Sequence, residues 1–312
     1  MQSLKLTASE LDCLRFIANH GRVQLSEISE ELKVLPPQVS RITARLGEKD
    51  FIRTEKVGLS KIVSLSETKH AALFRRLTIE LAHMPLDELL SGPSLEVLSA
   101  ICFLQLKSRK EIAVNALVSE PSVAKALGKM KQAGIVQKIG LTYSVSPRFQ
   151  MLREFVIEFR HYLNQKIALK FARDAVVLWE CNAEFIIESV GSQEGDGFQL
   201  THISMFGSFG VPLMVPKSYF FYSPFVKRLK FEDIVIHSLL VGARDMLPIL
   251  LVWKRNERTT DRKYLEKQAE RYRIKDGVKE VVTYFANEGR ERAPGFPPWN
   301  EFLLRAKEYG LL

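Results

Sequence analysis

The chain has 312 residues, of which 46% are hydrophobic and 26% charged, a composition typical of globular proteins that bury sizeable cores. Its formal net charge of +9 favours an anionic partner such as nucleic acid, although a merely solvated basic surface would look the same. The three cysteines lie far apart, so we expect neither disulfides nor cysteine-bound zinc. No apolar signal segment opens the chain, and no apolar run approaches the roughly 20 residues of a membrane span. We therefore expect a cytoplasmic protein without membrane contact.

The first elements expected are three helices and a hairpin. Thr7 and Glu10 match a capping box, and Gly21 suits the end of the helix that they begin. Ser26 is expected to cap a short second helix, and Pro36 suits the first turn of a third. Residues 51–66 read as strand, turn and strand, and residues 66–77 open a further helix. Helix, short helix, proline-started helix and basic hairpin together describe a winged helix-turn-helix domain.

The same pattern occurs again 84 residues later. Residues 9–52 pair with residues 93–136 without a gap, and the matches fall on apolar positions at helical spacing. Because the shared positions are those of a buried core, the repeat predicts a second winged helix-turn-helix domain with a shorter wing. The matched pairs include Leu11/Leu95, Leu14/Leu98, Ile17/Ile101, Ile28/Ile112, Pro37/Pro121, Val39/Val123, Leu46/Met130 and Phe51/Ile135.

Residues 7–80 resemble the MarR-type winged-helix transcriptional regulators. The resemblance is carried by "LSEISEELKVLPPQVSRITARLGEKDFI" and by "VSLSETKHAALFRRL", where His70 stands at a usual glycine position. Residues 93–147 resemble a second such domain. The resemblance implies binding to double-stranded DNA with the third helix in the major groove, and a homodimer. Winged helices also bind proteins, so the fold alone leaves that alternative open.

The third helix of each copy carries a polar stripe one residue before its apolar stripe. The side chains are of the types that hydrogen-bond base edges and phosphates, although a solvated helix face has the same composition. The expected DNA-contacting residues of the first copy are Gln38, Ser40, Arg41 and Arg45, and those of the second are Ser122, Lys125 and Lys129.

The two wings differ in charge. The first carries Arg53, Lys56 and Lys61, whereas the second offers Lys138. Residues 1–78 hold 13 basic and 9 acidic residues, a net charge of +4, and residues 79–150 hold 8 and 6, a net charge of +2. We therefore expect the first winged helix to be the stronger DNA reader.

The C-terminal half is predicted to be mixed, with strands early and helices late. A helix from Phe149 is expected to join it to the second winged helix. Pro248 leaves residues 245–256 ambiguous. Strands are expected at residues 183–190, 198–206 and 214–223, and helices at 231–244, 261–274, 276–287 and 297–310.

Catalytic patterns are weak in this half. "GSFG" at residues 207–210 is similar to the glycine-serine turn of nucleotidyltransferases, but no acid follows in "VPLMVPKSYFFYS" to hold metal ions. Ser208 lacks a GxSxG frame, and the six histidines show no metal-ligand spacing. We therefore expect no enzyme activity, catalytic residue, metal or cofactor, and keep a nucleotidyltransferase-like enzyme as the alternative.

The order "YSPFVKRLKFEDIVIHSLL", "DRKYLEKQAERYRI" and "VKEVVTYF" is similar to the C-terminal domain of AbiEi-type antitoxin and regulator proteins. That resemblance implies an autoregulating repressor, with or without a toxin partner, and the second winged helix departs from its pattern.

The complete prediction is an α+β chain with three domains. Two tandem winged helix-turn-helix domains, mainly α with small β wings, span residues 1–80 and 81–148. A mixed α+β effector or oligomerisation domain spans residues 149–312. The expected function is a DNA-binding transcriptional regulator, acting as a repressor or autoregulator, with a toxin or small-molecule effector as further partner of the C-terminal domain. An antitoxin or protein-interaction module is the other alternative.

Overall fold

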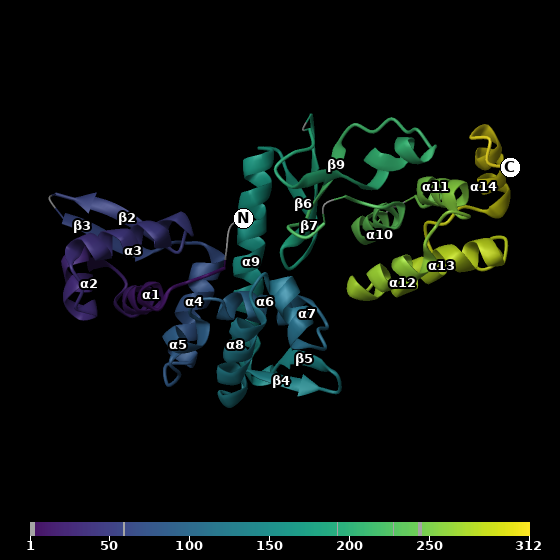
Figure 1. The fold of residues 1–312 in the computed structure, drawn as a ribbon. Helices are drawn as coiled ribbons and strands as arrows, with labels where there is room; N and C mark the ends of the chain where they lie inside the picture. Colours follow the sequence, from purple (N-terminus) through teal and green to yellow (C-terminus); the bar gives the residue numbers. More distant parts are fainter. Residues whose placement is uncertain (1–3, 59, 192, 227, 243–244) are drawn as a thin grey trace. The chain divides into compact units, whose positions relative to one another are not determined.

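The computed structural model describes residues 4–58, 60–191, 193–226, 228–242 and 245–312. They form an α+β protein with small antiparallel sheets, as predicted (Figure 1). The chain divides into two compact units, one ending at Leu163 and the other running from Asn164 to Leu312. The division falls within helix α9 (Gln150–Phe171), and the domain boundaries expected at residues 80 and 148 remain predictions.

The N-terminal unit opens with a winged helix-turn-helix. Helices α1 (Ala8–His20), α2 (Leu25–Leu32) and α3 (Pro36–Glu48) are followed by the wing strands β2 (Ile52–Val57) and β3 (Ser60–Leu65). The two-residue strand β1 (Val23–Gln24) pairs with β3, which gives the sheet order β1-β3-β2. The apolar stripes of α1 and α3 meet in one core, as the sequence predicted. Its fully or almost fully buried members include Leu11, Leu14, Ile17, Val39, Ile42 and Leu46.

Local hydrogen bonds define the helix ends. Thr7 and Glu10 form the predicted capping box, and Gly21 ends α1 with a φ of 80°, a conformation that favours glycine. The cap expected at Ser26 is wrong. Helix α2 begins at Leu25, and its N-cap is Gln24, two residues before Ser26. The Gln24 backbone N–H donates to the Glu27 carboxylate at 2.5 Å.

The same order of elements recurs in α6 (Ser94–Phe103), α7 (Arg109–Ala116), α8 (Glu120–Gln132), β4 (Val136–Ile139) and β5 (Thr142–Val145). Both ends of α7 and of α8 lie 84 residues after the corresponding ends of α2 and α3. Even the left-handed residue that ends the short helix recurs, at Lys33 with φ 51° and at Leu117 with φ 53°.

Helices α4 (Lys69–Glu80), α5 (Leu86–Leu90) and the start of α9 complete the unit, together with the 3₁₀ turn η1 (Pro147–Phe149). Phe155 and Phe159 of α9 pack against Phe51 of the first copy. On the second copy, the buried Arg160 forms an ion pair with the buried Glu96. Glu96 also accepts a hydrogen bond from the Leu4 backbone N–H at 2.8 Å, so one carboxylate of α6 joins both ends of the unit.

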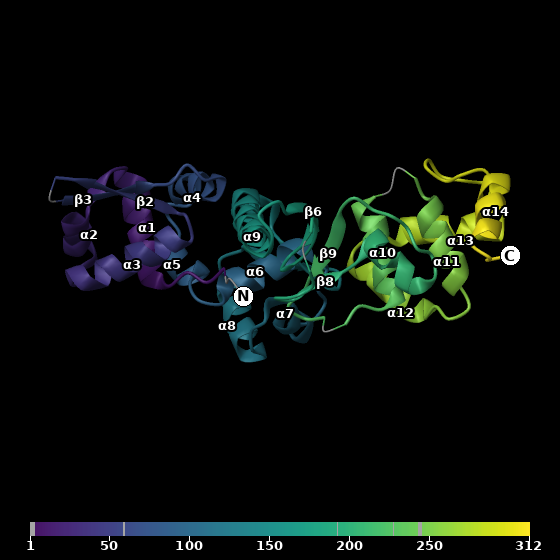
Figure 2. The same cartoon turned by 90° about the horizontal axis from the view of Figure 1, so that it is seen from above.

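The C-terminal unit begins with a four-stranded antiparallel sheet of order β6-β7-β9-β8. Its strands are β6 (Val176–Cys181), β7 (Glu184–Ser189), β8 (Phe198–Leu200) and β9 (Ser218–Tyr222). One face packs on the end of α9 around Phe185, Phe198 and Phe220 (Figure 2). The strand expected over 198–206 is shorter than predicted, because residues His202–Phe209 form the 3₁₀ helix η2, and β6 was not predicted.

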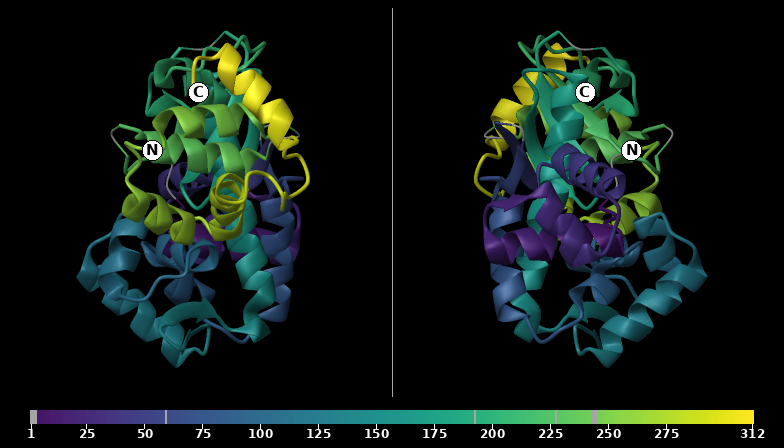
Figure 3. Two further views of the ribbon diagram at one scale, coloured as in Figure 1. Left: turned by 90° about the vertical axis from the view of Figure 1, so that its right-hand side faces the viewer. Right: turned by 90° about the vertical axis from the view of Figure 1, so that its left-hand side faces the viewer.

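Five helices follow among the described residues. They are α10 (Phe231–Val241), α11 (Leu247–Asn256), α12 (Arg262–Arg271), α13 (Lys275–Ala286) and α14 (Trp299–Glu308). Pro248 occupies the first turn of α11, where its missing N–H costs nothing, and α14 packs beside α11 (Figure 3). Residues 243–244, expected to end α10, lie outside the described residues. Within the described residues, every helix is too short or too polar to span a bilayer.

Candidate nucleic-acid interface

The outer face of α3 carries the predicted polar stripe. Gln38, Ser40, Arg41 and Arg45 are all exposed, while Val39 between them is fully buried. The guanidinium groups of Arg41 and Arg45 form no ion pair with any of the described residues. Gln38 is partly engaged, since its side-chain oxygen accepts the Leu35 backbone N–H at 3.3 Å. Two long cations on this face therefore remain available to an external anion.

The start of α3 has no acidic residue in its first turn. The unpaired N–H groups at a helix N-terminus carry a partial positive charge, so a nearby carboxylate would compete with phosphate there. Helix α8 has Glu120 at the same place, one residue before Pro121. Helices α3 and α8 thus differ in charge at their N-terminal ends.

The first wing places two lysines opposite each other. Lys56 on β2 pairs directly with Lys61 on β3, and both side chains are exposed. Like charges in directly opposite cross-strand positions destabilise a hairpin, and an anion bound between them removes that cost. The third predicted wing residue is engaged: Arg53 forms an exposed ion pair with Glu67 at 3.2 Å. Exposed pairs of this kind exchange partners at little cost.

The corresponding residues of the second copy are more fully engaged within the chain. The Ser122 hydroxyl hydrogen-bonds the Ser119 hydroxyl at 2.9 Å, as part of the N-cap of α8. The half-buried Lys129 donates to the backbone oxygen of Glu88 in α5 at 3.3 Å. Lys125 is exposed. Helix α5 therefore occupies part of the surface beside α8.

The exposed lysine of the second wing contacts a ring of its own hairpin. Lys138 lies over the Tyr143 ring, with 5.5 Å between the ammonium nitrogen and the ring centroid, and Lys131 approaches the same ring at 5.0 Å. The tip of this wing is apolar, since Ile139 is 60% and Leu141 71% exposed. These engaged partners were not predicted from the sequence. The Lys138–Tyr143 contact was predictable, because the two-residue turn sets these residues opposite each other.

The C-terminal unit holds a cavity of about 1050 Å³ at the β8 edge of the sheet, lined by Phe198, Leu200, Ser208 and Arg228 among others. Gly207 and Gly210 lie in and after η2, as turn residues. His202 of η2 and His237 of α10 are both buried. The Thr201 hydroxyl and His237 Nδ1 are 2.7 Å apart, and burial lowers the pKa of His202 to about 4. In the part of the chain that the structure describes, no group of His, Cys, Asp or Glu is placed to hold a metal ion.

Comparison with known proteins agrees with the winged-helix geometry at the N-terminal end of the chain. Residues 6–57, which run from two residues before α1 to the end of β2, match the model of the MarR family. Residues 195–311 match a C-terminal family model described as HVO_2833_C, and no curated protein matches the chain. The similarity to AbiEi-type proteins is not among these matches. The MarR match supports, at the level of the family, a DNA-binding transcriptional regulator with a winged helix.

Proposed function

We propose that this protein is a transcriptional regulator that binds double-stranded DNA chiefly through its first winged helix. Helix α3 would lie in the major groove, with Gln38 and Ser40 toward base edges and Arg41 and Arg45 toward bases and phosphates. The observation that carries the proposal is the exposed, ion-pair-free state of Arg41 and Arg45 on the outer face of α3, among the described residues.

The wing adds phosphate contacts in this account. Lys56 and Lys61 face each other across the hairpin, and a phosphate placed between them would relieve their mutual repulsion. Arg53 would exchange Glu67 for a phosphate oxygen, since its ion pair is exposed. Each phosphate neutralised releases condensed counterions, so affinity should fall steeply with salt.

The second winged helix contributes less in this account. Ser122 belongs to the N-cap of its own helix, and Lys138 lies over the Tyr143 ring. Lys129 donates a hydrogen bond to the Glu88 backbone oxygen. Of the four residues of this copy that were predicted to contact DNA, Lys125 alone would be available to a phosphate. Repression of the protein's own gene, a homodimer, and a toxin or small-molecule partner of the C-terminal unit remain predictions from the sequence.

A matched pair of double variants tests the ranking. Arg41→Ala with Arg45→Ala removes the exposed stripe of α3, and Lys125→Ala with Lys129→Ala removes its counterpart on α8. The assay is a mobility shift on fragments selected from genomic DNA, beginning with the region upstream of the protein's own gene. We expect the first pair to abolish the shift and the second to weaken it a few-fold. Equal losses from the two pairs would refute the ranking, and no loss from the first would refute the proposal.

A further inference from the structure

Positive charge is concentrated in one short part of the C-terminal unit. Residues 254–275 contain nine Lys and Arg and four Asp and Glu, a formal net charge of +5, whereas the whole chain carries +9. This segment covers the end of α11 and all of α12. More than half of the net charge of the protein therefore lies in 22 residues that the winged helices do not include.

The fold brings a second basic segment to the same place. The Asp261 backbone N–H, at the start of α12, donates to Glu232 Oε1 at 2.7 Å, and the Tyr264 hydroxyl donates to Asp233 at 2.9 Å. These bonds hold the first turn of α12 against the first turn of α10. Lys230, the residue before α10, lies 4.3 Å from the centroid of the Tyr264 ring. Cations from residues 228–230 thus lie beside those of residues 258–267.

We call the resulting cluster the α10–α12 basic surface. Its exposed members are Arg228, Lys230, Arg258, Arg262, Lys263 and Lys267. Among the described residues, none of the six forms an ion pair.

The acidic residues around this surface have other partners. Glu232 and Asp233 are buried and accept the hydrogen bonds that join α10 to α12, and Asp261 caps α12 by accepting the Tyr264 N–H at 3.0 Å. Glu266 is the remaining exposed carboxylate on the first two turns of α12. By contrast, Arg271 at the end of the helix forms an ion pair with the buried Glu184 at 2.7 Å. The basic surface therefore keeps a net positive charge.

Two features of α12 run against helix stability. Arg262 and Lys263 are its first two residues, where the helix dipole disfavours cations. Lys263 and Lys267 lie one turn apart on the same face, an arrangement of like charges that is also unfavourable. Unfavourable charge placements of this kind are expected at sites where function requires the positive charge.

We propose that the α10–α12 basic surface binds the phosphate backbone of duplex DNA and adds sequence-independent affinity to the contacts of the first winged helix. The proposal rests on the proposed function, which brings the chain to DNA. A bilayer is the less suitable anionic partner, because in the described part of residues 228–267 no large apolar side chain is exposed at this surface for insertion between lipids. Phosphates spaced along a duplex suit a row of separate cations.

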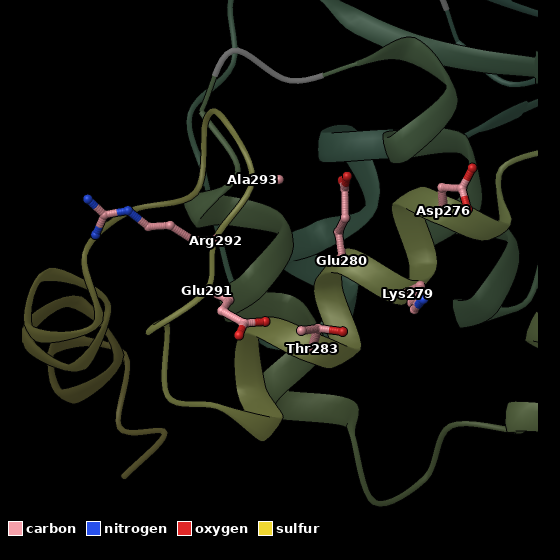
Figure 4. Close-up of a pocket in the computed structure, with 7 residues that line it drawn as sticks. All are labelled: Asp276, Lys279, Glu280, Thr283, Glu291, Arg292 and Ala293. Atoms are coloured by element: carbon pink, nitrogen blue, oxygen red, sulfur yellow. The ribbon is translucent and has the colours of Figure 1, made fainter.

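The test compares two quadruple variants of the full chain. The first is Arg258→Ala, Arg262→Ala, Lys263→Ala and Lys267→Ala, in which alanine favours the helix. The control removes the same charge elsewhere in the unit, with Lys279→Ala, Arg290→Ala, Arg292→Ala and Lys307→Ala. Lys279 and Arg292 line a pocket together with Asp276, Glu280 and Glu291, although the Arg292 side chain points away from it in Figure 4, so this lining carries no excess of positive charge.

The measurement is the slope of log affinity against log KCl concentration. Affinity is measured by fluorescence anisotropy on a duplex of about 40 base pairs that carries a selected site. Each phosphate contact contributes about 0.9 to the magnitude of this negative slope. We therefore expect the magnitude to fall by about 2 to 4 in the first variant and to stay unchanged in the control. The result that overturns the inference is a wild-type slope in the first variant, or an equal change in both.

The double variant Arg41→Ala with Arg45→Ala separates this inference from the proposed function. Loss of site preference in that variant, together with a normal slope in the α10–α12 quadruple variant, overturns the inference and leaves the proposed function standing. Normal site preference in the double variant, with a less steep slope in the quadruple variant, overturns the proposed function and leaves only the phosphate contacts of the α10–α12 basic surface standing. If vesicles with 30% phosphatidylserine bind the wild type but not the quadruple variant, while the DNA slope is unchanged, a membrane is the partner and the inference is wrong.

Discussion

The first and second winged helices share a core but not a surface. The ends of α2 and α3 recur 84 residues later in α7 and α8, and buried residues such as Val39 and Val123 occupy equivalent positions. On the outside, Arg41 and Arg45 are exposed without an ion pair among the described residues, whereas Lys129 and Lys138 contact their own chain. The buried apolar positions thus recur in both copies, while the cations on the outer face differ in the partners that they have within the chain.

The difference extends to the equivalent position in the first helix of each copy. Glu96 in α6 is buried against Arg160 and the Leu4 N–H, whereas Asp12, 84 residues earlier, is half-buried. Burial and the nearby Asp87 raise the pKa of Asp12. In the second copy this position is therefore the buried centre of contacts that join α6 to α9 and to Leu4, whereas in the first copy it is partly exposed.

The largest expected effect comes from breaking that centre. Arg160→Ala leaves the Glu96 carboxylate buried without its cation, which should lower the free energy of unfolding of the N-terminal unit by about 3 to 5 kcal/mol. Asp12→Asn, at the equivalent position of the first copy, should change it by less than about 1 kcal/mol. Hydrogen exchange of the α6 and α1 amides measures both. Similar losses from the two variants would contradict the distinction.

Acid should unfold the C-terminal unit before the winged helices. Because burial lowers the pKa of His202 from 6.5 to about 4, the stability that its neutral ring provides is full above about pH 6.5 and is lost as the pH falls toward 4, by up to about 3 kcal/mol. All three tryptophans lie in the C-terminal unit, so their fluorescence reports its urea midpoint alone.

The control for the acid experiment is His202→Asn, because asparagine tolerates the positive φ of 53° at this position. We expect a smaller drop in the urea midpoint between pH 7 and pH 4.5 in this variant than in the wild type. An identical drop would show that His202 does not cause the acid sensitivity.

The smallest expected effect has opposite signs in the two wings. Lys61→Gln removes the like-charge pair with Lys56, so it should raise hairpin stability by about 0.2 to 0.5 kcal/mol and weaken DNA binding. Lys138→Gln removes a cation from the Tyr143 ring, so it should lower stability by about 0.5 kcal/mol with little effect on DNA. Thermal unfolding and anisotropy titrations measure these changes. If both variants changed stability in the same direction, the contrast between the wings would be contradicted.

The parts of the fold that could be predicted depend on neighbours in sequence. The Thr7 cap, the end of α1 at Gly21 and the proline start of α3 involve residues within four positions, and all three are confirmed. The partners of Lys129 and of the buried Arg160 could not be predicted in this way. Lys129 meets Glu88, which is 41 residues away, and Arg160 meets Glu96, which is 64 residues away. Which cations remain unpaired is decided by such tertiary contacts.

The C-terminal unit shows the same limit. The alternating pattern over residues 198–206 predicted one strand, but it ends at Leu200 and His202 adopts a positive φ that starts η2. Ser204 then accepts the Tyr219 backbone N–H at 2.9 Å with its side chain, a bond that a continued strand would make with its backbone. A side chain that replaces the backbone in a sheet leaves no mark in hydrophobic periodicity.

Photo-crosslinking from matched positions tests the central claim most directly. p-Benzoylphenylalanine would replace Ser40 of α3 in one variant and Ala124, its counterpart on α8, in the other, each mixed with the same selected duplex. The account predicts strong crosslinks to DNA from position 40 that salt suppresses, and few from position 124. Crosslinks of equal yield from both positions, or from position 124 alone, would contradict it.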